Sequence, residues 1–291
     1  MTRPAVLIGS TGQLAHDLRE AWAESNPGQP LVELTHADIE VSDVESVRAA
    51  LLPLEPALII NTSAYHRVDE VESEPTRAFA VNASGPRHLG LVAKEIDAVV
   101  CHLSTDYVFS GRLGRPLTEA DPVDPINVYG VTKAAGEMLL RETLAKHLIV
   151  RSGGLYGSAG SSGKGGNFVE TMLRLAGASK PLRVVEDQVL TPTATRVLAR
   201  QILALLAAGQ YGTFHATCQG SCSWFEFAAE IFRQAGLAPQ LGRQSTAESG
   251  ATATRPAFAV LDNSRLRELG LDELPSWQDA LAEYLALRSP R

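Results

Sequence analysis

Two side chains that can hold and transfer a proton lie four residues apart near the middle of the sequence. Tyr129 and Lys133 fall in a predicted helix over residues 127–146, so both project from the same face. A lysine ammonium beside a phenol stabilises the phenolate and lowers the tyrosine pKa, which is ordinarily about 10. Such a tyrosine serves as a proton donor and acceptor. Two residues on the exposed face of a helix can have the same spacing by chance. The chain contains only five lysines, which makes a chance placement beside Tyr129 less expected.

Hydroxyl groups are predicted to lie beside this pair. The run Ser104-Thr105-Asp106-Tyr107 directly follows an apolar segment, 98–104, that has the pattern of a buried strand. Ligands of open α/β folds bind outside the carboxyl ends of the strands, so this run is expected at the ligand-binding edge of the sheet. A hydroxyl, a phenol and a lysine at that edge form a site for reduction of a carbonyl group.

A glycine turn near the N-terminus predicts a second component of the site. Gly9-Ser10-Thr11-Gly12 lies between a predicted strand, 4–8, and a predicted helix, 13–25. Glycines let the backbone approach a pyrophosphate, and the free N–H groups at the start of the helix attract the anion. The turn therefore indicates a dinucleotide site, although two glycines also fit a plain strand–helix turn.

The end of the second predicted strand bears on which dinucleotide binds. Leu34-Thr35-His36 contains no acidic residue to bind an adenosine 2′-hydroxyl and no clear arginine clamp for a 2′-phosphate. We therefore expect NADH and NADPH to bind with similar affinity. Glu40 and Val41 follow and can reach the adenosine. Glu40 has the alternative interpretation of a solvated loop charge.

These residues need a scaffold of alternating strands and helices, and the first half of the sequence has that pattern. The predicted strands are 4–8, 31–34, 57–61, 98–104 and 147–152, and the predicted helices are 13–25, 43–53, 76–95 and 127–146. The second helix opens at a predicted capping box, Ser42-Asp43-Val44-Glu45. The expected fold class is α/β, a Rossmann-type doubly wound parallel sheet.

The second half has a different pattern. A glycine- and serine-rich stretch, 157–166, is expected to form either a lid or a linker. Beyond it we predict a strand at 182–185 and helices at 168–178, 195–208, after the capping box Ser223-Trp224-Phe225-Glu226, and at 277–287. These elements indicate a small, mostly helical lobe. The predicted division is a dinucleotide-binding domain, 1–155, and a mainly substrate-binding lobe, 156–291, part of which returns to the first domain.

Composition argues against several classes of protein. The 291 residues carry a formal net charge of -7, which argues against a general affinity for nucleic acid. The first apolar run, Ala5-Val6-Leu7-Ile8, is too short for a signal peptide or a membrane span, so we expect a cytoplasmic protein. Cys101, Cys218 and Cys222 lack metal-ligand spacing and the seven histidines are scattered, so no structural metal is predicted.

Together these motifs resemble those of an extended short-chain dehydrogenase/reductase, and more narrowly those of the dTDP-4-dehydrorhamnose reductase family. The resemblance runs through nearly the whole length, and its most specific stretches are Ser104-Thr105-Asp106-Tyr107-Val108-Phe109 and Glu72-Ser73-Glu74-Pro75. The other matching stretches are Gly9-Ser10-Thr11-Gly12-Gln13-Leu14, Asn61-Thr62-Ser63-Ala64-Tyr65, Val68-Asp69, Ala80-Val81-Asn82, Asn127-Val128-Tyr129-Gly130, Lys133, Gly136-Glu137, Gly166-Asn167-Phe168, Asp187-Gln188, Pro192-Thr193 and Arg255-Pro256.

The resemblance implies reduction, by NADPH or NADH, of the 4-keto group of a nucleotide-activated deoxysugar. It implies that Tyr129 protonates the carbonyl oxygen, that Lys133 tunes the tyrosine and binds the nicotinamide ribose, and that Thr105 holds the substrate oxygen. Asp106 and Gly154 join Thr105 as implied substrate contacts. The implied cofactor ligands are Gly12, Gln13 and Leu14 at the diphosphate, with Gly9 and Thr11 in the same turn, Glu40 and Val41 at the adenosine, Ala64, Tyr65 and His66 behind the ribose, and Tyr129 and Lys133 themselves.

Three positions depart from this family. Its members commonly carry Asp where this chain has Glu40, Trp where it has Gly154, and Gly where it has Leu190. Loss of the ring removes apolar contact with the sugar, and Leu190 adds bulk nearby. The identity of the substrate's sugar therefore stays open. Members sometimes bind magnesium through acidic residues at a dimer contact. Asp17 lies near such a position, but one carboxylate does not support a metal site.

Two other functions remain open from the sequence. A related regulatory subunit of methionine adenosyltransferase keeps this fold and binds dinucleotide while serving as a partner protein. A reductase or epimerase of another nucleotide-sugar would differ only in its substrate. The intact Thr105, Tyr129 and Lys133 favour an enzyme that converts dTDP-4-dehydro-6-deoxy-L-mannose to dTDP-L-rhamnose. We expect it to be a monomer or homodimer, with no nucleic-acid or membrane partner.

Overall fold

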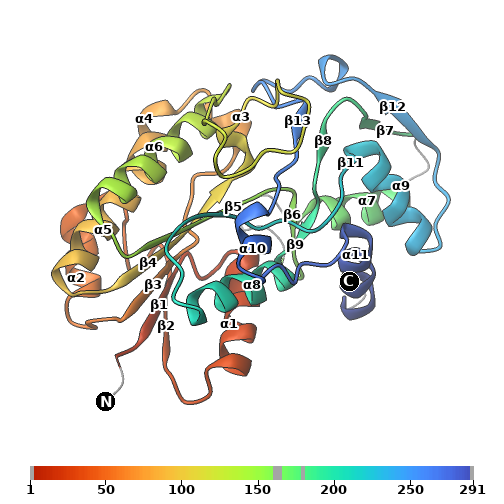
Figure 1. Cartoon of the computed structure of the whole chain (residues 1–291). Helices are drawn as coiled ribbons and strands as arrows, with labels where there is room; N and C mark the ends of the chain where they lie inside the picture. The colour runs from red at the N-terminus through yellow and green to blue at the C-terminus, as the bar shows by residue number, and fades with distance from the viewer. Residues whose placement is uncertain (1–2, 160–165, 178–180, 289–291) are drawn as a thin grey trace.

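A six-stranded parallel sheet forms the centre of the molecule in the computed structural model, which describes residues 3–159, 166–177 and 181–288 (Figure 1). The strand order is β10-β5-β4-β3-β1-β2, and every neighbouring pair runs in parallel. Because the order reverses beside β1, a crevice is left at the carboxyl ends of β1 and β3. The predicted doubly wound sheet is confirmed. Its strands are β1 (Ala5–Ile8), β2 (Leu31–Leu34), β3 (Leu58–Asn61), β4 (Val99–Thr105), β5 (His147–Ser152) and β10 (Gly212–His215).

Helices cover both faces of the sheet. Alternate residues of β1 divide between two buried clusters: Leu7 belongs to one, and Val6 and Ile8 belong to the other. The cluster of Leu7 includes apolar residues of α1 (Gln13–Ser25) and α8 (Thr195–Ala207); the cluster of Val6 includes those of α2 (Val44–Leu51), α5 (Gly85–Glu95) and α6 (Val128–Thr143). Within the described residues, no helix has both the length and the apolar character needed to cross a membrane.

A wider turn interrupts the third predicted helix. After α3 (Val68–Val71), α4 (Pro75–Phe79) passes into a π-helical turn before α5 begins. Pro86 explains the widening, because proline has no N–H to donate and its ring clashes with the carbonyl of the residue four positions earlier. The turn directs Asn82 toward Tyr65, so the interruption contributes to the site described below.

The start of α2 differs from the predicted capping box. Asp43 is the N-cap residue, and its carboxylate accepts a hydrogen bond from the backbone N–H of Glu45 at 3.0 Å. The prediction that Ser42 caps this helix is wrong, because its hydroxyl donates instead to the carboxylate of Glu40 at 2.6 Å. By contrast, the capping box predicted at Ser223 is present at the start of α9.

The second half contains helices and a strand at 182–185, as predicted, together with further short strands that the sequence did not reveal. Most of these further strands have only two residues and carry no alternating pattern, which explains their omission. The helices are α7 (Phe168–Ala176), α9 (Trp224–Gln234), α10 (Ser264–Glu268) and α11 (Trp277–Leu287). The strands pair as β6 (Leu155–Tyr156) with β9 (Thr193–Ala194), β7 (Leu182–Val185) with β12 (Leu241–Gln244), and β8 (Val189–Leu190) with β11 (Cys222–Ser223) and β13 (Phe258–Ala259).

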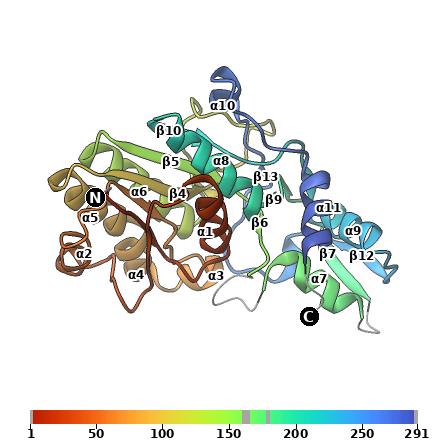
Figure 2. The same ribbon diagram turned by 90° about the horizontal axis from the view of Figure 1, so that it is seen from below.

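Part of this second half lies on the main sheet. Helix α8 packs against α1, and β10 pairs with β5. Figure 2 shows α7, α9 and α11 gathered at one side of the molecule, away from α2 and α5. The division at residue 155 stays a prediction. Residues 160–165 of the glycine-rich stretch lie outside the described residues, so the choice between lid and linker stays open.

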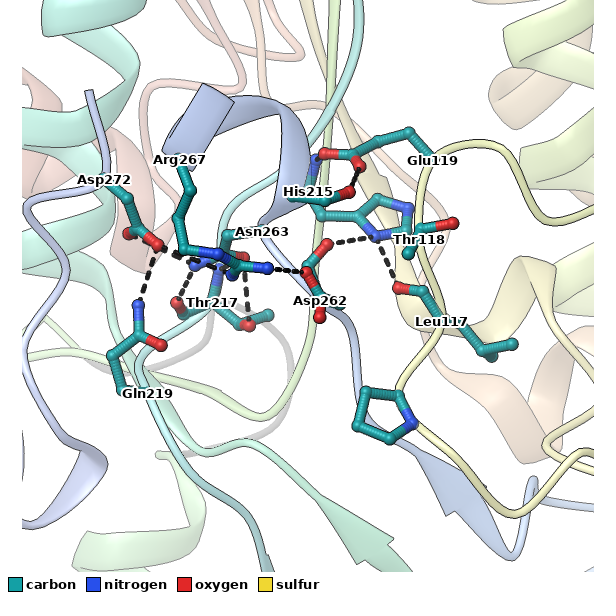
Figure 3. A network of polar contacts seen from close by, with 12 residues as sticks. Leu117, Thr118, Glu119, His215, Thr217, Gln219, Asp262, Asn263, Arg267 and Asp272 are labelled. Atoms are coloured by element: carbon teal, nitrogen blue, oxygen red, sulfur yellow. Dashed lines mark hydrogen bonds and ion pairs between the residues drawn. The ribbon is translucent and has the colours of Figure 1, made fainter. Parts of the chain in front are cut away.

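A polar network joins three segments that are distant in the sequence (Figure 3). The Nδ1 atom of His215, at the end of β10, lies 3.0 Å from the carbonyl oxygen of Leu117, and the His215 backbone N–H donates to Glu119. Asn263 accepts a hydrogen bond from the N–H of Thr217 at 3.1 Å and donates to the carbonyl of Thr217 at 2.8 Å. The network therefore fixes the loop of Glu119 and the start of α10 against the sheet.

Replacement of Asn263 tests this network. Asn263 is 3% exposed, so Asn263→Ala leaves the N–H and carbonyl of Thr217 without these partners in the interior. We expect the free energy of unfolding, measured by urea denaturation, to fall by about 2 kcal/mol. Gln219→Ala removes one bond to Asp272 at the exposed end of the network and should change it by less than about 0.5 kcal/mol. Equal losses in both variants would contradict this interpretation.

Candidate active site

A cleft of 780 Å³ opens at the carboxyl ends of the central strands. The ends of β1, β3 and β4 and the start of α6 line one side, and β8, α7 and α9 line the other. All residues predicted for catalysis, cofactor or substrate line this cleft: Gly9, Thr11, Gly12, Gln13, Leu14, Glu40, Val41, Ala64, Tyr65, His66, Thr105, Asp106, Tyr129, Lys133 and Gly154.

The glycine turn between β1 and α1 packs closely against the end of β3. Gly9 has a φ of 79°, and a Cβ there would lie 2.9 Å from the backbone nitrogen of Ser63. Gly12 is the N-cap of α1 and no side chain caps this helix, so its first N–H groups are available to a ligand. The Oε1 atom of Gln13 is buried without a partner among the described residues. These features fit a dinucleotide, because the helix start suits its diphosphate.

Local hydrogen bonds fix the side chains at the β2 end of the cleft. Glu40 accepts from the N–H and hydroxyl of Ser42, at 2.9 and 2.6 Å, which holds its carboxylate at the cleft wall. The guanidinium of Arg77 lies 4.8 Å from the centroid of the Tyr65 ring and also lines the cleft. Arg77 was not anticipated from the sequence. It gives this end of the cleft a cation that Thr35 and its neighbours lack.

Asn82 holds the wall predicted to lie behind the ribose. The N–H of Tyr65 donates to Oδ1 of Asn82 at 2.8 Å, and Nδ2 of Asn82 donates back to the Tyr65 carbonyl at 2.9 Å. Nδ2 also donates to the hydroxyl of Thr132 on α6 at 3.1 Å. Because Asn82 is almost fully buried, these bonds tie the wall to the helix that carries Tyr129.

The start of α6 places Tyr129 beside the end of β4. Asn127 caps this helix, and its Oδ1 accepts from the N–H of Gly130 at 2.7 Å. Gly130 lies so close to the turn after β4 that a Cβ there would be 2.1 Å from the carbonyl oxygen of Tyr107. The rings of Tyr129 and Tyr107 meet edge to face, with centroids 5.9 Å apart, and the Tyr129 phenol lies beside the Thr105 side chain. Only glycine permits this approach.

Asp106 determines the electrostatics of this hydroxyl pair. The hydroxyl of Thr105 donates to Oδ1 of Asp106 at 2.8 Å, and burial raises the pKa of Asp106 to about 7. Burial, together with the charge of Asp106, raises the pKa of Tyr129 above its ordinary range. The lowered tyrosine pKa expected from the nearby lysine is therefore wrong for this arrangement. The phenol keeps its proton, which suits a proton donor.

Lys133 is buried behind the tyrosine and is 1% exposed. Its Nζ donates to the carbonyl oxygen of Leu103 at 2.7 Å and lies 3.1 Å from Nε2 of His102. Burial lowers the pKa of Lys133 to about 8. The lysine also lines the cleft. The alternative that Tyr129 and Lys133 are merely an exposed pair on the helix surface is therefore excluded.

A buried ion pair braces the strands behind these groups. Arg151 on β5 donates through Nε and Nη2 to the two carboxylate oxygens of Glu137 on α6, at 2.9 and 2.6 Å. Ser104, the residue before Thr105, also donates to this carboxylate. Glu137 follows Lys133 by one helical turn, so the pair fixes β4, β5 and α6 relative to one another. The pairing was not found from the sequence, because its partners come from distant segments.

The sugar end of the predicted site has a different shape from that implied by the family resemblance. Gly154 has a φ of 59°, and a Cβ there would lie 2.9 Å from Cδ1 of Leu190. Leu190 therefore occupies space beside the position of the missing ring. Phe168 and Trp224, with ring centroids 4.6 Å apart, line the same cleft from the lobe. These two aromatic residues were not assigned from the sequence.

Three possible metal ligands lie together outside this cleft. One ligand atom each of His16, Asp17 and Glu20 falls within 4.8 Å of the others. Asp17 accepts a hydrogen bond from Thr195, and Glu20 forms an ion pair with Arg196 at 3.0 Å. Both carboxylates are thus already paired within the protein.

Comparisons with known proteins agree with this geometry. The family model described as the RmlD substrate binding domain matches residues 3–289. A dTDP-4-dehydrorhamnose reductase of Streptomyces griseus is 40% identical over 97% of this chain and 93% of its own length. A dTDP-4-keto-6-deoxy-D-glucose reductase of Streptomyces niveus is 37% identical over 99% of this chain and 98% of its own length. The structure of a dTDP-4-dehydrorhamnose reductase of Bacillus anthracis in complex with NADP has a TM-score of 0.92 and 34% identity, covering 98% and 99% of the two chains.

The raised pKa of Asp106 predicts a dependence of stability on pH. An unfolded aspartate ionises near pH 3.9, whereas folded Asp106 keeps its proton to about pH 7, so this residue lowers stability as pH rises between those values. Asp106→Asn cannot ionise and so removes this loss of stability, while its amide oxygen can still accept a hydrogen bond from Thr105. Urea midpoints should show a gain over the wild type at about pH 8 that disappears at about pH 4. Asp124→Asn, at an exposed carboxylate, is the control. A gain that does not vary with pH would refute the assignment.

Proposed function

Because the chain belongs to the RmlD substrate binding domain family, we propose that it is an NAD(P)H-dependent reductase of the 4-keto group of a nucleotide-activated deoxysugar. The proposed substrate is dTDP-4-dehydro-6-deoxy-L-mannose and the product dTDP-L-rhamnose. The observation that carries this proposal is the meeting of Thr105, Tyr129 and Lys133 in one cleft with an uncapped helix start behind a glycine turn. Location in the cytoplasm, as a monomer or homodimer, stays a prediction.

In the proposed mechanism, each of these residues has one task. The reduced nicotinamide, when bound, supplies a hydride to the carbonyl carbon. Tyr129 donates its phenolic proton to the carbonyl oxygen as negative charge develops there, and the adjacent Thr105 hydroxyl orients that oxygen. Lys133 stabilises the phenolate that remains. Thr105 and Lys133 are buried, which keeps water from their polar groups and strengthens their electrostatic interactions.

For the sugar of the substrate, one observation favours a second candidate. Leu190 fills space beside Gly154, which narrows the sugar end of the cleft. The Streptomyces niveus relative is named for a dTDP-4-keto-6-deoxy-D-glucose substrate. A sugar of that configuration is therefore the alternative. A purely regulatory subunit is disfavoured, because Thr105, Tyr129 and Lys133 all line the same cleft.

Removal of the phenolic hydroxyl tests the catalytic assignment. Tyr129→Phe should leave cofactor binding nearly intact and lower kcat by two or more orders of magnitude, because only the proton donor is lost. Lys133→Ala should weaken both binding and turnover. Fluorescence titration with NADPH and steady-state kinetics measure the two quantities. Tyr211→Phe, at an exposed phenol, is the matched control. Wild-type turnover in Tyr129→Phe would instead favour the regulatory interpretation.

The contact between positions 154 and 190 predicts non-additive effects on catalysis. Gly154→Trp alone places a large side chain at a positive φ against Leu190, so we expect kcat/KM for the rhamnose precursor to fall at least tenfold, about 1.4 kcal/mol. Leu190→Gly in the same chain frees that space and should restore part of the loss. Comparison of the two single variants, the double variant and the wild type gives the coupling. Strictly additive losses would show that Leu190 does not shape the sugar site.

A further inference from the structure

We propose that His102, oriented by Asn61, is a positioning residue that sets the charge of Lys133 through the tautomer of its own ring. His102 is fully buried on β4, between Asn61 at the end of β3 and Lys133 on α6. Neither the resemblance nor the comparisons assign it a role. The inference rests on the proposed function only where it concerns Tyr129.

The orientation of the Asn61 amide is fixed independently of the histidine. Oδ1 of Asn61 accepts from the backbone N–H of Ser63 at 3.1 Å and from the Ser63 hydroxyl at 2.6 Å. A backbone N–H can only donate, so the oxygen must face Ser63. The amide NH₂ group therefore faces His102, with Nδ2 of Asn61 at 3.0 Å from Nδ1 of the ring.

The two ring nitrogens of His102 thus face one fixed donor and one variable group. A neutral imidazole has one N–H and one acceptor nitrogen. When Lys133 is an ammonium, it can only donate, so Nε2 must accept and Nδ1 carries the hydrogen, which then meets the NH₂ of Asn61. When Lys133 is a neutral amine, Nε2–H donates to its lone pair and Nδ1 accepts from Asn61. All groups are then satisfied.

The geometry therefore favours the neutral amine in the absence of a compensating charge. Loss of the lysine proton to solvent converts an ammonium beside the Nδ1–H tautomer into an amine beside the Nε2–H tautomer, with one proton released. In either state one Nζ hydrogen binds the carbonyl of Leu103 and another remains for the cleft. His102 itself stays neutral, because burial and the charge of Lys133 hold its pKa well below the ordinary value.

Other titratable groups near this pair come from three elements. Glu137 lies one turn from Lys133 on α6 and favours the ammonium, but its carboxylate is paired with Arg151 of β5. The turn after β4 contributes Asp106, which acts on Tyr129, and Tyr107. Strand β3 presents only the neutral amide of Asn61. The tautomer of His102 and the proton on Lys133 are therefore coupled, and the hydrogen bond from Asn61 favours the tautomer that accompanies the neutral amine.

Nitrogen-15 NMR of the histidine rings in the whole protein tests this directly and needs neither substrate nor cofactor. Spectra of protein labelled at histidine, with His102 assigned from the His102→Gln variant, report which ring nitrogen carries hydrogen. We expect His102 to pass from Nδ1–H to Nε2–H as pH rises through about 8, where Lys133 loses its proton. His215 is the internal control, because carbonyl oxygens 3.0 and 3.2 Å from its Nδ1 fix one tautomer. A His102 tautomer that does not change with pH would overturn the proposal.

Asn61→Asp gives a second, directional test. A carboxylate accepts from Nδ1–H and leaves Nε2 free to accept from the ammonium, and it still accepts from Ser63. In the proposed mechanism kcat falls at high pH as Lys133 loses its proton. In Asn61→Asp the pH at which kcat falls should therefore rise by about one unit or more, with His102 held as Nδ1–H. A merely structural role would lower kcat or stability without moving that pH, and this result counts against the proposal. If the variant fails to fold, the wild-type titration decides. If the protein reduces no sugar, the NMR result still stands.

Discussion

The burial of Lys133 is the constraint on which the rest of the site depends. An ammonium removed from water costs several kcal/mol unless hydrogen-bond acceptors and opposite charge replace the solvent. The carbonyl of Leu103 and the ring of His102 supply the acceptors. The carboxylate of Glu137 supplies the charge, and Arg151 holds that carboxylate in place. Groups on β4, β5 and α6 therefore decide together whether Lys133 carries a charge.

The same arrangement links the cofactor side of the cleft to the catalytic side. Asn82 bonds both to the loop of Tyr65 and to Thr132 on α6, so a shift of the helix is transmitted to the wall behind the ribose. Gly130 allows α6 to approach the turn after β4, which brings Tyr129 beside Thr105. These contacts place two hydroxyl groups and the amino group of Lys133 around one cleft. That placement makes a carbonyl oxygen the natural ligand.

The sheet and its ligand-binding edge could be predicted because buried parallel strands appear as apolar runs followed by polar residues. The two-residue strands of the lobe could not, since so short a run has no period, and β10 could not because Gly212-Thr213-Phe214-His215 is not an apolar run. The Tyr129–Lys133 spacing located the catalytic helix, but it gave the wrong direction for the tyrosine pKa. Burial and Asp106, which decide that direction, come from the tertiary structure. Arg77 and the Phe168–Trp224 pair likewise depend on how distant segments meet.

Transfer of deuterium from the cofactor to the sugar measures the central claim most directly. The protein would be incubated with dTDP-4-dehydro-6-deoxy-L-mannose and with NADPH deuterated on either face of the nicotinamide. We expect one of the two cofactors to place a single deuterium at C4 of dTDP-L-rhamnose, detected by mass spectrometry and NMR. Oxidation of the cofactor without deuterium in a sugar product, or no oxidation with this or any other 4-keto nucleotide-sugar, would contradict a reductase built on Thr105, Tyr129 and Lys133.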